Sequence, residues 1–419
     1  MRRETHHYGS RVSEIVAFGV IVLVAAAAIL FALLAIKLTE RLAIPAPAIF
    51  LLLAALASDL VPRLGDVSIQ TVERLGVAAL IPIPFEGGLH MGWRRFRAAG
   101  RAVAALGVAG TFGVAAVVAV AAKLLGFEWT TAALLGAALA PTDPAVMFSV
   151  LGSRGISGKA RTILEGEAGA NDPVGIALVI GVLDFAVGEH GSASKVVADF
   201  VVAMAVGSAI GIAGAFVLGY LMRRLALPSE SLYSLRALAF AALIYGIASV
   251  AHGSGFLAVF VAGVLLGDAD LPHKDEILSF MTSLASLAEM VVFIALGLTI
   301  HLADFGSGRL VFEALVLAVV LTFVARPLVV GVLLSRASLT GGERLFVIWG
   351  GLRGAVPILL GAFALDAGVD HALRVYEIVF FVVAFSVIVQ GTTIPLAARR
   401  LGVEVALTPR TLDPLRAET

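Results

Sequence analysis

Three acidic residues lie close together in a sequence that is otherwise strongly apolar. The stretch EGEAGANDPVG, residues 165–175, contains Glu165, Glu167 and Asp172, with Asn171 beside the last of them. A carboxylate in an apolar segment is costly, so such residues usually face a protein interior or a cavity and mark an ion path or an ion pair. The i, i+4 spacing puts Glu167 and Asn171 on one helix face, with Asp172 adjacent.

Other apolar stretches of the chain also contain ionisable residues. Two of these are arginines, Arg326 and Arg353, and the acidic ones are Glu86, Asp143 and Glu289. An arginine side chain stays protonated in proteins, so each buried arginine should recruit a partner. We expect Glu167 to pair with Arg326 and to remain ionised.

An acid that is left without an arginine could do different chemistry. Burial favours the neutral form of a carboxyl group, so such an acid can hold a proton in one state and a cation in the other. One site then serves two ligands in turn, which is the physical basis of cation/proton exchange. Asp172 is our candidate for this group, Glu86 is either a ligand or a residue near a cavity mouth, and Glu289 is expected to be mainly structural.

One apolar stretch is interrupted in its middle by prolines. In AALLGAALAPTDPAVMFSVL, Pro141 and Pro144 flank Thr142 and Asp143, and a proline inside a helix removes a backbone hydrogen bond. Unwound backbone survives in a bilayer only where protein or a water-filled cavity satisfies it. We expect the Thr142 hydroxyl and the freed carbonyls around Asp143 to supply oxygen atoms to a monovalent cation that Asp172 binds. Asp143 either stabilises the opposed helix dipoles at the break or joins this shell through water.

A second stretch, GGLRGAVPILL, is interrupted by glycines. Gly354 and Pro357 should interrupt the helix near Arg353, and we expect Arg353 and Gly354 to support this broken segment. A pair of broken helices in matching positions of two halves indicates the midplane site of a secondary transporter, whereas two ordinary kinked helices are the alternative.

Composition places these residues in a membrane protein. Of 419 residues, 60% are hydrophobic and 14% are charged, against about 25% charged in soluble domains. The pattern predicts an all-α polytopic protein of about thirteen transmembrane helices. The predicted spans are 15–36, 44–61, 71–91, 102–123, 130–151, 162–187, 196–222, 232–251, 255–267, 281–302, 309–334, 343–365 and 374–397.

Several classes of function find no support in the sequence. The chain has no cysteine and no HExxH motif, which argues against disulfides, cysteine-based metal sites and a membrane zinc hydrolase. A net charge of +0 gives no long-range attraction to nucleic acid. We expect neither an enzyme nor a bound cofactor.

Lysine and arginine are unequally shared between the two sets of loops. The richer set includes Arg94, Arg95, Arg97 and Arg161 and should be cytoplasmic, which puts the N-terminus outside and the C-terminus inside the cell membrane. We expect one transmembrane domain over 1–400 and a short cytoplasmic tail over 401–419. A cleaved signal peptide is the alternative for the first span.

The order of the motifs resembles a known family. APTDP, EGEAGANDP, HGSGFLAVFVAGVLLG, GGLRGAVPILL and VIVQGTTIPLAARRLG occur in the order typical of NhaP-type monovalent cation/proton antiporters. The form of EGEAGANDP is most similar to the potassium/proton branch. The resemblance covers nearly the whole membrane region.

The resemblance implies a fold and a set of roles. It implies two inverted six-helix repeats with crossed broken helices, a core and a dimerisation subdomain, and a homodimer in the lipid membrane. Asp172 would bind Na⁺ or K⁺ and the proton, Asn171 would go with electroneutral exchange, and Glu167 and Arg326 would form a buried ion pair bridged by Asn171. Ala168 departs from the serine of many sodium-selective members, which leaves the cation open.

Three other functions fit parts of the pattern. A passive cation channel could use the same polar core without competition between proton and cation. In a non-transporting scaffold all buried charges would be paired, and an organic-anion transporter would be expected to carry fewer acidic side chains at its broken helices.

Overall fold

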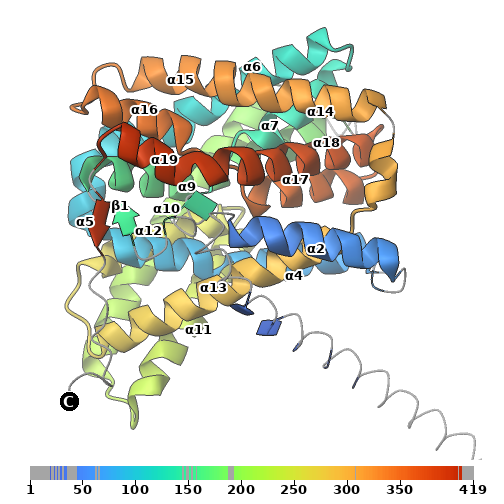
Figure 1. The fold of residues 1–419 in the computed structure, drawn as a ribbon. Coiled ribbons are helices and arrows are strands. Elements are labelled where there is room, and N and C mark those ends of the chain that lie inside the picture. The colour runs from blue at the N-terminus through green and yellow to red at the C-terminus, as the bar shows by residue number, and fades with distance from the viewer. Residues whose placement is uncertain are drawn as a thin grey trace, which may run out of the picture.

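The chain folds almost entirely into helices, as its composition predicts (Figure 1). The computed structural model describes residues 45–61, 67–143, 158–186, 193–306 and 308–403, short pieces at 64, 146–147, 151, 154–156 and 405–407, and scattered positions between 19 and 34. Most of the predicted span 15–36 and all of Pro144 lie outside the described residues.

The first half of the described chain contains the helices that precede and follow the proline break. They are α2 (Ala46–Leu60), α4 (Ile69–Leu80), α5 (Pro82–Ala104), the π-helix η1 (Ala105–Gly110), α6 (Thr111–Leu124), α7 (Trp129–Leu139), α9 (Gly158–Ala186) and α10 (Ala193–Arg224). A short strand, β1 (Arg154–Ile156), precedes α9.

The second half has the same character. Its helices are α11 (Glu230–Val250), α12 (Gly255–Gly267), α13 (Lys274–Leu298), the 3₁₀ helix η2 (Leu302–Gly306), α14 (Gly308–Val320), the π-helix η3 (Leu321–Ala325), α15 (Arg326–Leu333), α16 (Gly341–Trp349), α17 (Ala355–Asp366), α18 (Ala372–Phe385), the π-helix η4 (Ser386–Gln390) and α19 (Gly391–Arg400). Strand β2 (Val405–Leu407) follows.

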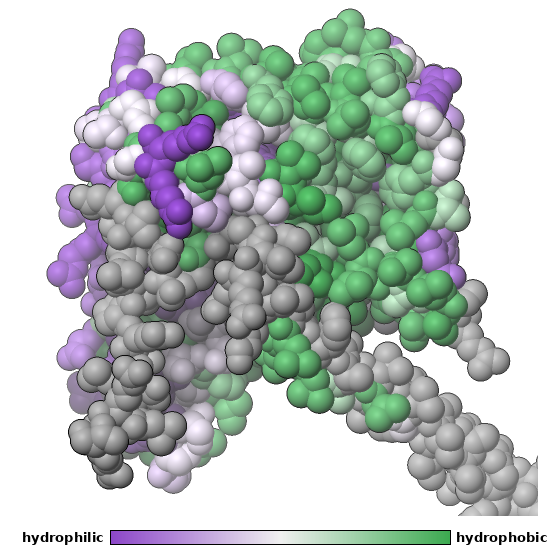
Figure 2. Space-filling view, in the orientation of Figure 1, coloured by the Kyte–Doolittle hydropathy of each residue, from purple (hydrophilic) through white to green (hydrophobic). Residues whose placement is uncertain are grey.

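Helix length and hydropathy agree with a membrane location. Seven continuous helical segments of the described chain are long and apolar enough to cross a bilayer, and α2, α7, α12 and α17 are shorter apolar helices. Hydrophobic side chains spread over the middle of the face shown in Figure 2, and hydrophilic ones lie toward its left and right edges. Every predicted span from 44 to 397 overlaps at least one of these helices.

The predicted loop between the third and fourth spans is wrong in detail. Residues 92–101 are helical, and α5 runs through them with one interruption at Gly92, where φ is 67° and ψ is 160°. Glycine tolerates this positive φ, and the arginines that follow are good helix formers. The Asp268 carboxylate accepts a hydrogen bond from the Arg94 amide at 2.6 Å, which satisfies one backbone donor after the kink.

The helices form two groups in Figure 1. α14, α15, α17, α18 and α19 lie in the upper half, α2, α4, α11 and α13 lie in the lower half, and α9 lies between them. We call these groups the upper and the lower layer. The predicted division into inverted repeats and into core and dimerisation subdomains stays a prediction.

The predicted tail, 401–419, begins with ordered structure. Strand β2 pairs antiparallel with β1, in a register that sets Gly155 opposite Ala406. Two segments that lie far apart in the sequence are thereby joined beside the start of α9. Residues after 407 lie outside the described part of the chain.

Close packing of α5 against α12 depends on glycine. A Cβ atom added to Gly263 would collide with the Phe85 carbonyl oxygen and lie 3.2 Å from the Gly88 Cα atom. We expect Gly263→Ala to lower the free energy of unfolding by about 1–3 kcal/mol, because backbone has to move. Thermal unfolding of the purified protein in detergent measures this. Gly246→Ala, in α11, is the control because its Cβ would meet nothing within 4 Å; equal stability of the two variants would contradict the packing argument.

Candidate ion-binding site

The two predicted helix breaks meet in the structure. α7 ends at Leu139 and is followed by non-helical residues 141–143, while α16 and α17 are separated by residues 350–354. The Asp143 amide donates a hydrogen bond of 2.8 Å to the Leu352 carbonyl, which joins the two unwound segments directly. The Asp143 carboxylate lies against Gly354, where a side chain would collide with it. Glycine at this position is therefore needed for the close approach.

Arg353 satisfies carbonyl groups at the breaks. Its Nε donates to the Leu139 carbonyl at 2.7 Å, at the end of α7, and its Nη1 donates to the Gly351 carbonyl at 2.9 Å. The side chain is 1% exposed. A helix has partial negative charge at its C-terminal end, so a cation there is stabilising. Among the described residues, the hydrogen-bond partners of the Arg353 side chain are backbone carbonyls and not a carboxylate. The charge pattern of the sequence did not predict this.

Glu167 of α9 and Arg326 of α15 form a buried, bidentate ion pair. The distances are 2.6 Å from Nη1 to Oε1 and 3.0 Å from Nη2 to Oε2. The remaining donors of Arg326 reach the carbonyls of Ile348 and Val347 at the end of α16. The guanidinium lies against Gly351, where any side chain would collide with it. This ion pair therefore fixes α9 against the second break.

Asn171 does not bridge that ion pair, contrary to what the resemblance implies. Its side-chain amide donates to the Thr142 hydroxyl at 2.7 Å, and its side-chain oxygen has no hydrogen-bond partner among the described residues. Asn171 and Thr142 are both buried. Asn171 thus connects α9 to the first break, beside Pro141, whose ring packs against Gly175.

Asp172 lies on a cavity of about 440 Å³ between the two layers. Asp143 lies on the same cavity, and Ala168 contributes to its wall. One oxygen of Asp172, Oδ1, is buried and has no hydrogen-bond partner among the described residues. An unpartnered carboxylate oxygen on a cavity of this size is suited to bind a proton or a small cation.

Helices α5 and α13 add two further glutamates to the lining of the cavity. Glu86 of α5 accepts a hydrogen bond from Thr282 of α13 at 3.0 Å and lies 3.0 Å from His90 Nδ1. Glu289 of α13 also lines the cavity, and its Oε1 is buried without a partner among the described residues. The sequence, from which we expected Glu289 to be mainly structural, did not predict that this residue lines the cavity.

The cavity also contains residues that sequence reasoning did not select. Arg161 and Glu165 line it and form an ion pair of 2.6 Å, and the side chains of His90 and Arg161 are 39% and 35% exposed. Thr282 and Ser286 of α13 line the cavity as well. The sequence could have indicated these two, because Thr282, Ser286 and Glu289 follow one another at i, i+4 and i+7 in an apolar helix.

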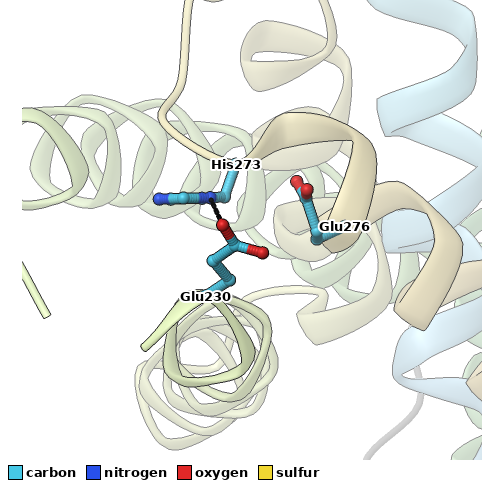
Figure 3. A group of neighbouring side chains, drawn as sticks. All are labelled: Glu230, His273 and Glu276. Carbon is cyan, nitrogen blue, oxygen red and sulfur yellow. Dashed lines mark ion pairs between the residues drawn. The ribbon is translucent and has the colours of Figure 1, made fainter. Parts of the chain in front are cut away.

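One surface group has the spacing of metal ligands. Figure 3 shows Glu230 of α11, His273 before α13 and Glu276 on the first turn of α13, with ligand atoms within 4.8 Å of one another. His273 Nδ1 lies 3.5 Å from Glu230 Oε1, so the two already form an ion pair, and Glu230 is 66% exposed. None of these residues lines the cavity.

Comparison with known proteins agrees with this geometry. Residues 14–400 match the model of the transmembrane sodium/hydrogen exchanger family. The chain belongs to the sodium/hydrogen exchanger family. The prediction from motif order is thereby confirmed, and the protein is an integral membrane protein whose named relatives are cation/proton antiporters.

Individual exchangers show how far the similarity extends. The chain is 34% identical to the K⁺/H⁺ antiporter NhaP of Alkalimonas amylolytica over 93% of its own length and 68% of that protein. It is 33% identical to the K⁺/H⁺ antiporter NhaP2 of Shewanella oneidensis over 89% and 65%. It is 31% identical to the Na⁺/H⁺ antiporter NhaH of Halobacillus aidingensis over 66% and 69%. The chain therefore spans about two thirds of the length of these curated relatives.

A solved structure has the same fold as this exchanger. The sodium proton antiporter MjNhaP1 of Methanocaldococcus jannaschii superposes with a TM-score of 0.76 at 23% identity, covering 87% of this chain and 97% of that one.

The buried ion pair generates a stability prediction. Arg326→Ala should lower the free energy of unfolding by about 3–5 kcal/mol, because it leaves the Glu167 carboxylate buried and uncompensated. The double variant Glu167→Gln with Arg326→Met should recover much of that loss, since it removes both charges. Thermal unfolding in detergent reports both effects.

Arg309→Ala is the matched control for this experiment. Arg309 pairs with Glu313 at 2.9 Å, but its side chain is 75% exposed and Glu313 keeps Arg374 as a second partner. A loss below about 1 kcal/mol is expected. A loss for Arg326→Ala no larger than that of the control would show that the ion pair is not a main source of stability.

Proposed function

We propose that this exchanger is a secondary antiporter that moves K⁺ or Na⁺ in one direction and H⁺ in the other through competition for Asp172. The single observation that carries the proposal is the Asp172 carboxylate, which lies on the cavity between the two layers without a cationic partner among the described residues. A passive channel would not need a group that exchanges one ion for the other.

The neighbours of Asp172 suit a monovalent cation. Asp143 offers a second carboxylate on the cavity, and oxygen ligands are those that hard cations prefer. Thr142 does not line the cavity, and its hydroxyl is joined to α9 through Asn171. Asn171 lies next to Asp172 and is neutral, so the site carries one charge fewer than an Asp–Asp pair would give. We infer from this that the exchange is electroneutral.

We infer that the cavity opens toward one side of the membrane. His90 and Arg161 are partly exposed at one end, on the side of the arginine-rich loops. Farther along, α17 packs closely on α4, where a Cβ on Gly76 would lie 3.0 Å from Leu359 Cδ1. We propose that this arrangement is open toward the cytoplasm, with the N-terminus outside and the C-terminus inside.

Transport then requires one layer to move against the other. α9, the breaks and their helices would form the moving core, while α2, α4, α5 and α13 would belong to a dimerisation subdomain that is fixed by a second copy of the chain in the lipid membrane. This division, like the inverted repeats, is supported by family membership and by the position of the cavity between the layers.

Substitution of Asp172 tests the proposed exchange. In proteoliposomes with an acid interior, addition of KCl or NaCl should collapse the proton gradient for the wild type, as read by a pH-sensitive dye, and choline chloride should not. Asp172→Asn should abolish the response while the protein remains folded, because an amide cannot bind and release the proton.

Asp184→Asn is the matched control for Asp172→Asn. Asp184 lies on the same helix, is exposed and does not line the cavity. Its variant should transport like the wild type. Exchange retained by Asp172→Asn would remove Asp172 from the mechanism, and a wild type that conducts cations without moving protons would favour a channel.

The electroneutral exchange that we infer from Asn171 can be tested separately with a membrane potential. The initial rate of cation-driven proton movement should stay the same when a membrane potential of either sign is imposed, because no net charge moves. Measurement of the rate at several clamped potentials checks this. A rate that follows the potential would show electrogenic exchange and a different stoichiometry.

A further inference from the structure

Helix α13 presents a polar face to the cavity. Thr282, Ser286 and Glu289 follow one another at helical spacing, and all three line the cavity with Ala285 and Val292. Residues at i, i+4 and i+7 lie on the same side of a helix. An apolar membrane helix keeps such a face only where the face does not meet lipid.

Glu289 is the deepest polar residue on that face. It lies seven residues beyond Thr282, which corresponds to about 10 Å along a helix. Thr282 belongs to the exposed end of the cavity and donates to Glu86. Glu289 is therefore less exposed than Thr282 and Ser286, and its Oε1 atom is fully buried.

Its lack of partners distinguishes Glu289 from two other acids of the cavity. Glu86 has Thr282 and His90, and Glu165 has Arg161. For Glu289 the described residues supply neither a cationic partner nor a hydrogen-bond donor to the buried Oε1 atom. A glutamate kept only for structure is expected to have its oxygens paired, because leaving them unpaired is costly.

The charges on the two walls of the cavity suggest what could satisfy Glu289. Asp143 and Asp172 come from the wall of the breaks and α9, and Glu289 and Glu86 come from α13 and α5. Acids that line one cavity repel one another when they are ionised, and a cation between them removes the repulsion. The cavity would therefore hold a monovalent cation better with Glu289 than without it.

We propose that Glu289 is a further cation-attracting carboxylate of the transport site, which acts from the wall opposite Asp172 and sets the apparent affinity for the transported cation. The inference rests on the proposed function, because it concerns the same cation and the same cavity. Glu289 differs from Asp172 in its role. Asp172 is the group at which exchange occurs, whereas Glu289 supplies negative charge that favours entry and occupancy.

The test is a cation titration of exchange in proteoliposomes. Glu289→Gln should raise the apparent KM for K⁺ or Na⁺ roughly three- to thirtyfold, as one unit charge across a partly solvated cavity would. The maximal rate should stay within about twofold of the wild type, because Asp172 is intact. Glu289→Asp should keep a KM close to that of the wild type, since it retains the carboxylate.

Glu276→Gln is the matched control. Glu276 lies on the same helix but at the surface beside His273 and Glu230, outside the cavity (Figure 3). Its variant should have the KM of the wild type. An unchanged KM in Glu289→Gln, or a loss of folded protein and maximal rate without a change in KM, would overturn the proposal and leave Glu289 structural.

The absence of native cysteine allows a second test if Glu289→Gln does not fold. Glu289→Cys would carry the only thiol of the chain. Modification with a negatively charged sulfonatoethyl reagent should restore the low KM, and a positively charged trimethylammonioethyl reagent should not. Equal effects of the two reagents would contradict a role for charge.

The experiment separates this inference from the proposed function. A wild type without cation-driven proton movement would refute antiport itself. A wild type that exchanges normally beside a Glu289→Gln variant with the same KM would refute only the role of Glu289.

Discussion

An unwound peptide segment inside a bilayer has to find its hydrogen-bond partners within the protein, and this requirement organises the centre of the exchanger. The two broken helices meet this requirement by contacting each other at their unwound segments. The Asp143 amide bonds to the Leu352 carbonyl, and Arg353 donates to carbonyls on both segments. The charges match the helix ends, since the guanidinium lies at the C-terminal end of α7 and the Asp143 carboxylate lies beside Gly354 at the start of α17. Each break is therefore part of the environment that stabilises the other.

Helix α9 is positioned by the same centre, and its geometry divides the roles of its polar residues. Glu167 is held by Arg326, which also bonds to carbonyls at the end of α16. Successive residues of an α-helix point about 100° apart, so neighbours can face different surroundings. Asn171 faces Thr142 in the first break, and Asp172 faces the cavity. One helix thus supplies a fixed ion pair, a neutral contact and an acid that is free to exchange ligands.

In the proposed function, the cavity between the layers is the transport site. Two of its acids come from the first break and α9, and two come from α5 and α13. Movement of one group of helices against the other therefore changes the repulsion between these acids. A bound cation or proton lowers the cost of bringing the acids together, whereas an empty and fully ionised site resists it. Coupling between ion binding and movement can therefore arise from ordinary charge repulsion across the cavity. Glu289 and Glu86 line this cavity together with Asp143 and Asp172, although they lie far from them in the sequence.

The sequence by itself determined the membrane class, the all-helical fold class, the two breaks and the family, because each depends on local composition, on proline and glycine, or on motif order. It also indicated Asp172, since an acid between apolar neighbours is costly wherever the chain folds. Only the tertiary structure decided which partners each charge has. Arg353 bonds to carbonyls, Asn171 bonds to Thr142 and not to the ion pair, and Glu289 faces the cavity without a partner. These contacts join residues far apart in the chain, and the energy of a buried charge depends on the groups around it in space, which its sequence neighbours do not specify.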